Sequence, residues 1–285
     1  MPPVTGDADP YGTAAHRWVA NCSMLFTEVP LLARPAAARA AGFDAVEFWW
    51  PFEHSVPVDA DVEAFVSAVT DAGVALIGLN LPAGDMAAGD RGLISVPGRE
   101  AELADGLAVA AGIGARLRVH GCNALYGNRI DGVDPARQDE VALANLARVA
   151  ETLAVFGARV WLEPLSGLSA YPLRTATDAL AVADRVFAAG APEPLLLADL
   201  FHLTANGDDV AAVLEAFGDR IGHVQVADHP GRHEPGTGQI PFAAHLRALH
   251  DVGYDGWVAG EYAPRGDTSA GLGWLPRAHR AVTDG

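Results

Sequence analysis

One junction recurs seven times along the chain and constrains the fold more than any other feature. In each copy an Ala-rich stretch with helical spacing runs into a glycine, and a strand-like apolar run follows within a few residues, as in "DAGVALIGLN" and "VFGARVWLEPL". The junction glycines are Gly42, Gly73, Gly112, Gly157, Gly190, Gly218 and Gly253. Glycine suits the end of a helix because it adopts the left-handed backbone conformation without a Cβ clash. Together with a first strand at residues 18–24, the seven junctions predict eight strands alternating with helices.

The segments between these strands have the apolar spacing of helices that pack on one face. Val62, Phe65, Val66 and Val69, for example, fall on one side of a helix. Strands that alternate with helices pair in parallel, and eight such units suit a closed (β/α)₈ TIM barrel. A doubly wound open sheet is less favoured, because no G-x-G-x-x-G motif follows the first strand.

The expected organisation is therefore a single α/β domain. We predict a flexible N-terminal tail at residues 1–16, a TIM barrel at residues 17–285 and a last helix near residues 270–283. No change of composition along the chain indicates a linker.

The charge and the cysteine content restrict the class of partner and the compartment. The net charge of −17 at pH 7 argues against a nucleic-acid partner and an anionic membrane surface, because both attract cationic proteins. Cys22 and Cys122 are too few for a disulfide framework, so a reducing cytoplasm is expected. No signal-peptide pattern and no apolar run of about 18 residues is seen, so no membrane span is expected. A homo-oligomer is compatible with this sequence.

Polar residues stand at the predicted carboxyl end of every strand. They are Asn21, Glu47, Asn80, His120, Glu163, Asp199, Gln225 and Glu261. Active sites of (β/α)₈ barrels lie at this end. Side chains alternate between the barrel interior and the helix layer, so Glu163 faces inward if Val160 and Leu162 face the helices. The same alternation directs the polar residues of the next three strands into the barrel mouth.

Four such residues together favour a metal site, although one alone would more often be a structural polar residue. Three converging carboxylates repel one another unless a cation neutralises them. Carboxylate and amide oxygens are hard ligands that suit Mg²⁺ or Mn²⁺ better than zinc. His202, three residues after Asp199 in "DLFH", is either structural or a hydrogen-bond donor to substrate. The strand ends Glu47 and His120 are further candidate substrate-binding residues.

Several long motifs show a resemblance to a known family. The chain resembles the hydroxypyruvate isomerase family of xylose-isomerase-like TIM barrels from about residue 18 to 275, through "LEPL", "DLFH", "IGHVQVADHPGRHEPGTGQI" and "GYDGWVAGEYAPRGDTSAGLGWL". The resemblance implies one divalent metal ion, Mg²⁺ or Mn²⁺ with Co²⁺ as a further option. The implied metal ligands are Glu163, Asp199, Gln225 and Glu261. It also implies that His202 and Arg232 contact the substrate.

The activity implied by the resemblance is an aldose–ketose-type isomerisation. Hydroxypyruvate and 2-hydroxy-3-oxopropanoate (tartronate semialdehyde) would interconvert through an enediolate whose charge the metal stabilises. Glu163 and Glu261 would be the acid and the base, in an order that the sequence does not assign, and Arg232 would hold the substrate carboxylate. Related keto-sugar epimerases usually have His where Gln225 stands, so the Gln favours the hydroxypyruvate branch. The chain departs from the family pattern at Ser166, in "EPLS", and at His229.

Three alternatives remain open at this point. The first is a sister activity with the same glutamates, either a 2-oxo-tetronate isomerase or a keto-sugar 3-epimerase. The second is a metal-dependent phosphodiesterase of the endonuclease-IV kind, which would need a His-rich multi-metal cluster and a basic face. The third is a metal-free binding or regulatory barrel. The first is tested by substrate screening, and the third by whether the purified protein binds a divalent ion.

Overall fold

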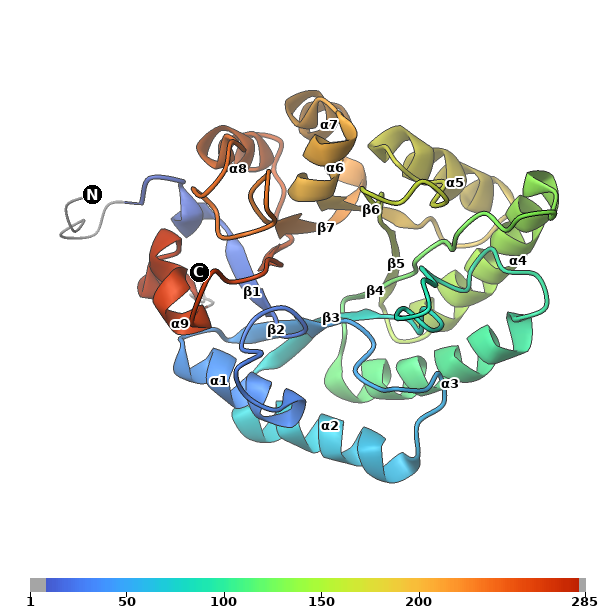
Figure 1. Ribbon diagram of the computed structural model, residues 1–285, viewed down its shortest axis with the longest axis horizontal. Coiled ribbons are helices and arrows are strands. Elements are labelled where there is room, and N and C mark those ends of the chain that lie inside the picture. Colours follow the sequence, from blue (N-terminus) through green and yellow to red (C-terminus); the bar gives the residue numbers. More distant parts are fainter. Residues whose placement is uncertain (1–8, 282–285) are drawn as a thin grey trace.

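The computed structural model describes residues 9–281, and its eight parallel strands close into one barrel in sequence order (Figure 1). The strands are β1 (Arg17–Asn21), β2 (Ala45–Phe48), β3 (Ala75–Asn80), β4 (Gly121–Asn123), β5 (Arg159–Leu162), β6 (Leu195–Asp199), β7 (Ile221–Val226) and β8 (Trp257–Gly260). Each strand pairs with the next, and β8 pairs with β1 to close the barrel. The predicted single-domain (β/α)₈ barrel is confirmed.

The helices form a ring around the outside of the strands (Figure 1). They are α1 (Arg34–Ala40), α2 (Asp59–Ala72), α3 (Glu100–Leu117), α4 (Pro135–Ala154), α5 (Ala176–Ala188), α6 (Leu200–Asn206), α7 (Val210–Phe217), α8 (Phe242–Asp251) and α9 (Thr268–Gly271). In α2 the predicted apolar face is buried at Phe65, Val66 and Val69. The helices therefore cover the outer face of the barrel with the residues that the helical spacing predicts.

The apolar core has two layers, and they confirm the predicted alternation of side chains. Val160 and Leu162 belong to the large layer between strands and helices. The barrel interior is filled by Val19, Ala45, Ile77, Trp161, Leu197, Trp257 and Ala259. Since Trp161, Leu197 and Ala259 face inward, the residues two positions later on the same strands face the barrel interior at its carboxyl end.

The junction glycines explain both the success and one failure of the strand prediction. Positive φ angles are found at five of them, Gly42, Gly73, Gly157, Gly190 and Gly253. Gly112 instead lies inside α3, which continues to Leu117 and ends with Arg118 at φ 56°. Strand β4 therefore begins only at Gly121. The prediction that His120 ends the fourth strand is wrong, because His120 precedes that strand.

The two ends of the described chain differ from the expected tail and last helix. From Asp9 onward the expected tail packs on the barrel: the His16 ring contacts the Leu246 carbonyl at 2.9 Å, and Trp18 donates to the Thr13 carbonyl at 2.8 Å. Residues 1–8 lie outside the described residues.

The predicted helix over 270–283 is wrong within the described range, where α9 ends at Gly271 and only short 3₁₀ turns follow up to residue 279. Pro276 separates those turns, and a proline restricts the residue before it away from helical backbone. Among residues 9–281, no helix is long and apolar enough to cross a membrane.

Candidate active site

Four oxygen-bearing side chains lie at the carboxyl end of the barrel, where strands β5 to β8 end. Glu163 and Glu261 directly follow β5 and β8, Asp199 is the last residue of β6, and Gln225 lies opposite Asp199 in β7. All four are buried, with at most 4% of their surface exposed. The structure thus brings together the four residues expected from sequence as metal ligands.

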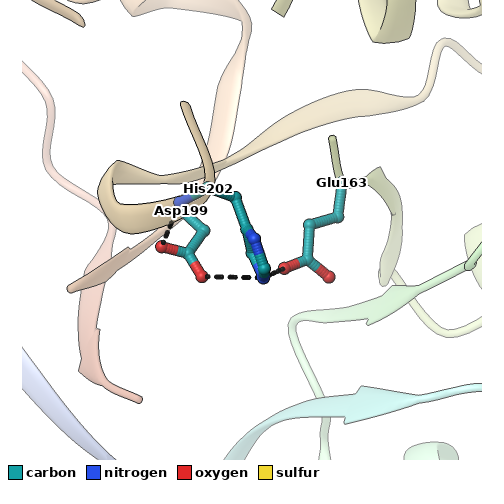
Figure 2. A group of neighbouring side chains, drawn as sticks. All are labelled: Glu163, Asp199 and His202. Carbon is teal, nitrogen blue, oxygen red and sulfur yellow. Dashed lines mark hydrogen bonds and ion pairs between the residues drawn. The ribbon is translucent and has the colours of Figure 1, made fainter. Parts of the chain in front are cut away.

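Three side chains whose ligand atoms lie close enough together to hold a metal ion are found at the centre of this mouth (Figure 2). Glu163, Asp199 and His202 each offer one ligand atom, and these atoms are within 4.8 Å of one another. Figure 2 shows the His202 ring between the two carboxylates, with Nε2 at 3.9 Å from Glu163 Oε1 and 3.7 Å from Asp199 Oδ2. Asp199 also begins helix α6, because its Oδ1 accepts the backbone N–H of Phe201 at 2.8 Å.

The proton on His202 can be placed from its hydrogen bonds. The backbone N–H of Ser166 is 3.0 Å from Nδ1, and a backbone N–H can only donate, so Nδ1 accepts and Nε2 carries the proton. Burial lowers the pKa of His202 to about 4, although Asp199 opposes this shift. His202 is therefore a neutral donor that points Nε2–H between the two carboxylates, which suits a substrate contact better than a metal bond.

Two of the four expected metal ligands have a buried oxygen that accepts no hydrogen bond from the described residues. These oxygens are Asp199 Oδ2 and Gln225 Oε1. A buried acceptor without a partner costs roughly 1–3 kcal/mol. Oxygen donors of this kind are the ligands that a hard divalent cation prefers. The residues present therefore fit a site for Mg²⁺ or Mn²⁺.

The electrostatics of the site also require a neutralising charge. Burial, followed by the charges of Glu261 and Asp199, raises the pKa of Glu163 well above its ordinary value. Burial is also the largest cause that raises the pKa of Glu261 to about 8, while Arg232 acts in the opposite direction. Protons or a cation must accompany these carboxylates near neutral pH.

Arg232 reaches this cluster from the loop after β7. Its Nη2 is 2.7 Å from Glu261 Oε2 and 3.5 Å from Asp199 Oδ2, and its Cζ lies 5.4 Å from the ring centroid of Phe201. About 24% of the side chain is exposed, so Arg232 connects the buried carboxylates with the surface. The structure thus brings the predicted substrate residues Arg232 and His202 to the same mouth.

The loop that carries Arg232 is fixed by Asp228. Arg232 has a φ of 56°, which is rare for a residue with a side chain. Its N–H donates to the Asp228 carbonyl at 2.9 Å. The Asp228 carboxylate accepts from the backbone N–H groups of His229, Gly236 and Ile240. These bonds hold the loop in the conformation that directs the guanidinium to the carboxylates.

The other two predicted substrate residues have different surroundings. His120 is exposed at the amino end of the barrel, with its ring 6.0 Å from that of Trp257 at the start of β8. It is not brought to the mouth, because α3 is longer than predicted. Glu47 lies in the barrel interior, 3% exposed, and both its oxygens are engaged by Gln225 and His223.

Sequence reasoning missed the contacts that three side chains make with the carboxylates. Asn123, at the end of β4, donates to Glu163 at 2.6 Å, and Trp49 donates its indole N–H to Glu261 at 2.6 Å. Asn21 donates to Glu261 at 3.0 Å. Its position at a strand end was noted but not its role. A correct start for β4 would have identified Asn123, whereas Trp49 follows β2 and reaches across the mouth without any local signal.

A cleft of about 840 Å³ lies over the loops that follow β2 and β3. It shares Trp49 with the site, and Trp50, Phe52, Asn80 and Arg99 are among its other lining residues. The cleft therefore meets the carboxylate cluster at Trp49, whose indole N–H donates to Glu261.

Comparisons with known proteins agree with this geometry. The family model described as "Xylose isomerase-like TIM barrel" matches residues 35–278. A protein of Streptomyces coelicolor named "Putative hydroxypyruvate isomerase" is 48% identical, with 95% of this chain and 99% of the relative covered. A 2-oxo-tetronate isomerase of Cupriavidus necator is 38% identical, with 91% and 97% covered.

A solved structure is similar along nearly its whole length. A crystal structure of an AP endonuclease, family 2, from Brucella melitensis has a TM-score of 0.83 at 32% identity, with 91% of this chain and 98% of that chain covered. The chain therefore belongs to the xylose isomerase-like TIM barrel family and, within it, to the hydroxypyruvate isomerase group, and it is an isomerase.

Proposed function

We propose that this isomerase interconverts hydroxypyruvate and 2-hydroxy-3-oxopropanoate with the help of one divalent cation. The observation that carries the proposal is the pairing of two buried glutamates of raised pKa, Glu163 and Glu261, with an arginine beside them. The glutamates suit proton transfer, and Arg232 suits a substrate carboxylate. The names of the relatives support the same reaction class.

The cation would be held by Glu163, Asp199, Gln225 and Glu261. Two of these residues, Asp199 and Gln225, have a buried oxygen without a hydrogen bond. When bound, Mg²⁺ or Mn²⁺ would polarise the substrate carbonyl as a Lewis acid. His202 lies outside the proposed ligand set, because its Nε2 carries a proton.

The two glutamates would move the protons of the isomerisation. One carboxylate takes a proton from the CH₂OH carbon of hydroxypyruvate, which gives an enediolate. The hydroxyl on that carbon passes its proton to the oxygen of the former carbonyl, and a proton returns to the neighbouring carbon, so that a carbonyl forms at the end of the molecule and a hydroxyl at C2. A pKa near the operating pH favours such an exchange, and burial brings the pKa of Glu261 to about 8.

Arg232 and His202 would orient the substrate. Arg232 stays charged, because Glu261, Asp199 and Glu163 outweigh the effect of burial and raise its pKa. A guanidinium binds a carboxylate through two parallel hydrogen bonds, so Arg232 would exchange Glu261 for the substrate carboxylate. The neutral His202 would donate its Nε2–H to a substrate oxygen.

A longer acid is the second candidate substrate. The 840 Å³ cleft borders the carboxylates through Trp49, which itself donates to Glu261. A four-carbon 2-oxo acid would extend its additional CH₂OH group into this cleft, and the relative from Cupriavidus necator is named for such a substrate. The adjoining cleft and the name of this relative therefore support 2-oxo-tetronate as an alternative substrate of the same type of reaction.

Nucleic acid is not favoured as a substrate, although one similar structure is that of an AP endonuclease. The chain carries a net charge of −17, and phosphate-backbone binding depends on Lys and Arg. Among residues 9–281, a single group of side chains has the geometry of metal ligands.

The free and buried Cys22 and Cys122 fit a reducing compartment, and we infer a cytoplasmic enzyme.

A comparison of substrates tests this proposal. The initial rates with hydroxypyruvate and with 2-oxo-tetronate are measured at equal Mn²⁺, and aldehyde formation from hydroxypyruvate is expected. Glu163→Gln keeps the shape of the side chain but removes the proton acceptor, and is expected to lower kcat by roughly 10²–10⁴-fold. Turnover of the four-carbon acid without any aldehyde from hydroxypyruvate would establish the second candidate instead.

A further inference from the structure

The amide of Gln225 has one orientation that its surroundings allow. Its Nε2 is 2.8 Å from Oε1 of Glu47, across the barrel interior. An ionised carboxylate only accepts hydrogen bonds, so the amide must present its NH₂ group to Glu47. The amide oxygen then points away from Glu47, and it is buried without any hydrogen-bond partner among the described residues.

Glu47 is itself held firmly on both of its oxygens. Oε1 also accepts from Asn21 at 2.8 Å, and Oε2 is 2.5 Å from Nε2 of His223. The His223 ring stacks on Trp161 with a centroid distance of 4.5 Å and an interplanar angle of 7°. Trp161 in turn belongs to the apolar filling of the barrel. The carboxylate of Glu47 is therefore a fixed acceptor beneath Gln225.

We propose that Glu47 is a positioning residue that makes Gln225 an oxygen donor to the cation. Without an acceptor at position 47 the amide could turn over, and its NH₂ hydrogens would then face the cation. The inference rests on the proposed function, since it assumes that Gln225 is a metal ligand. It assigns Glu47 no contact with substrate, in contrast to the expectation from sequence.

The affinity of the metal-stripped protein for Mn²⁺ tests this role without any activity assay. Free Mn²⁺ is measured by EPR during titration of the wild type and of Glu47→Leu. Leucine offers no hydrogen-bond acceptor, so the Gln225 amide can turn its NH₂ group toward the cation. We expect Mn²⁺ to bind roughly 10–100-fold more weakly, as for other residues that orient metal ligands.

A donor–acceptor swap separates positioning from packing. Gln225→Glu alone would place two carboxylates side by side and weaken folding or binding. In the double variant Glu47→Gln, Gln225→Glu, the amide at position 47 donates to one carboxylate oxygen and leaves the other for the cation. The double variant should therefore recover most of the affinity lost in Glu47→Leu. A role in packing alone predicts no such recovery.

A matched control is Glu234→Gln, which alters another buried carboxylate. Glu234 is 7% exposed and accepts from the backbone N–H of Arg265, so its replacement should leave the Mn²⁺ affinity unchanged.

Equal affinities of wild type and folded Glu47→Leu would overturn the positioning role. Absence of Mn²⁺ binding by the wild type would contradict the proposed function itself. If Glu47→Leu does not fold, the double variant decides: binding supports the inference, and a folded protein that does not bind overturns it.

Discussion

At the scale of single residues, the contact between His202 and Ser166 determines which nitrogen of His202 donates a hydrogen bond into the site. The backbone N–H of Ser166 occupies Nδ1, and burial keeps the imidazole neutral. The departure from the family pattern at Ser166 is therefore structurally tolerated, because the bond from position 166 comes from the backbone. The hydroxyl of Ser166, at 2.7 Å from the same nitrogen, adds a second contact.

This pair predicts a particular pH dependence for His202→Gln. We expect kcat/KM to fall by about 10–100-fold, because a neutral donor to the substrate is weakened. The shape of the pH profile between about pH 5.5 and 8 should stay the same, since His202 with a pKa of about 4 does not titrate there. Profiles of both proteins check this. Loss of an ionisation near neutral pH in the variant would contradict a neutral His202.

Arg232 predicts a change in substrate binding. Arg232→Ala should chiefly raise KM, because it removes a charged hydrogen-bond donor worth about 1.5–3 kcal/mol. The KM of Arg232→Lys should lie between those of the wild type and Arg232→Ala, since an ammonium keeps the charge but not the paired hydrogen-bond geometry. Steady-state kinetics on hydroxypyruvate measure this. An unchanged KM with a much lower kcat would instead assign Arg232 to the chemical step.

At the scale of elements, the later strands could be predicted and the fourth could not. Alternation along β5 to β8 correctly predicted that Glu163, Asp199, Gln225 and Glu261 face inward. Glu163, Asp199 and Glu261 each lie two positions after an inward-facing core residue. The helical stretch around Gly112 misled the prediction, since a glycine within a long helix resembles one at its end. Helix α3 continues to Leu117, and the polar end of β4 moves to Asn123.

Contacts across the barrel lay beyond what local sequence could reveal. Glu47 and His223 are separated by 176 positions, yet their side chains approach to 2.5 Å. Trp49 and Glu261 meet over 212 positions. Strand periodicity says which face a side chain occupies, but not which partner it meets there. The sequence therefore predicts which residues stand at the strand ends and which face they occupy, but not their hydrogen-bond partners.

At the scale of the whole molecule, the buried carboxylates link stability to pH and to metal. The pKa of Glu261 rises from its ordinary value of 4.5 to about 8 on folding. Between these values the folded protein binds more protons than the unfolded chain. The contribution of Glu261 to the stability of the metal-free protein therefore falls as pH rises through this window. A cation competes with these protons for the carboxylates.

Thermal unfolding should report this competition. We expect added Mn²⁺ to raise Tm more at about pH 8 than at about pH 6, relative to EDTA, because fewer protons must be displaced. In Glu261→Gln, the rise of Tm caused by Mn²⁺ should differ less between these two pH values. Scanning fluorimetry of both proteins checks the prediction. An equal or larger effect of Mn²⁺ at the lower pH would argue against carboxylates as its ligands.

The central claim is that this barrel uses a divalent cation and two glutamates to move a proton on a hydroxy-oxo acid. Its most direct test is the rate of aldehyde formation from hydroxypyruvate by enzyme treated with EDTA, freed of chelator and then reloaded with Mn²⁺ or Mg²⁺. We predict that turnover is lost on stripping and returns on reloading, and that Glu163→Gln stays inactive with metal present. Undiminished turnover by the stripped enzyme would contradict the account.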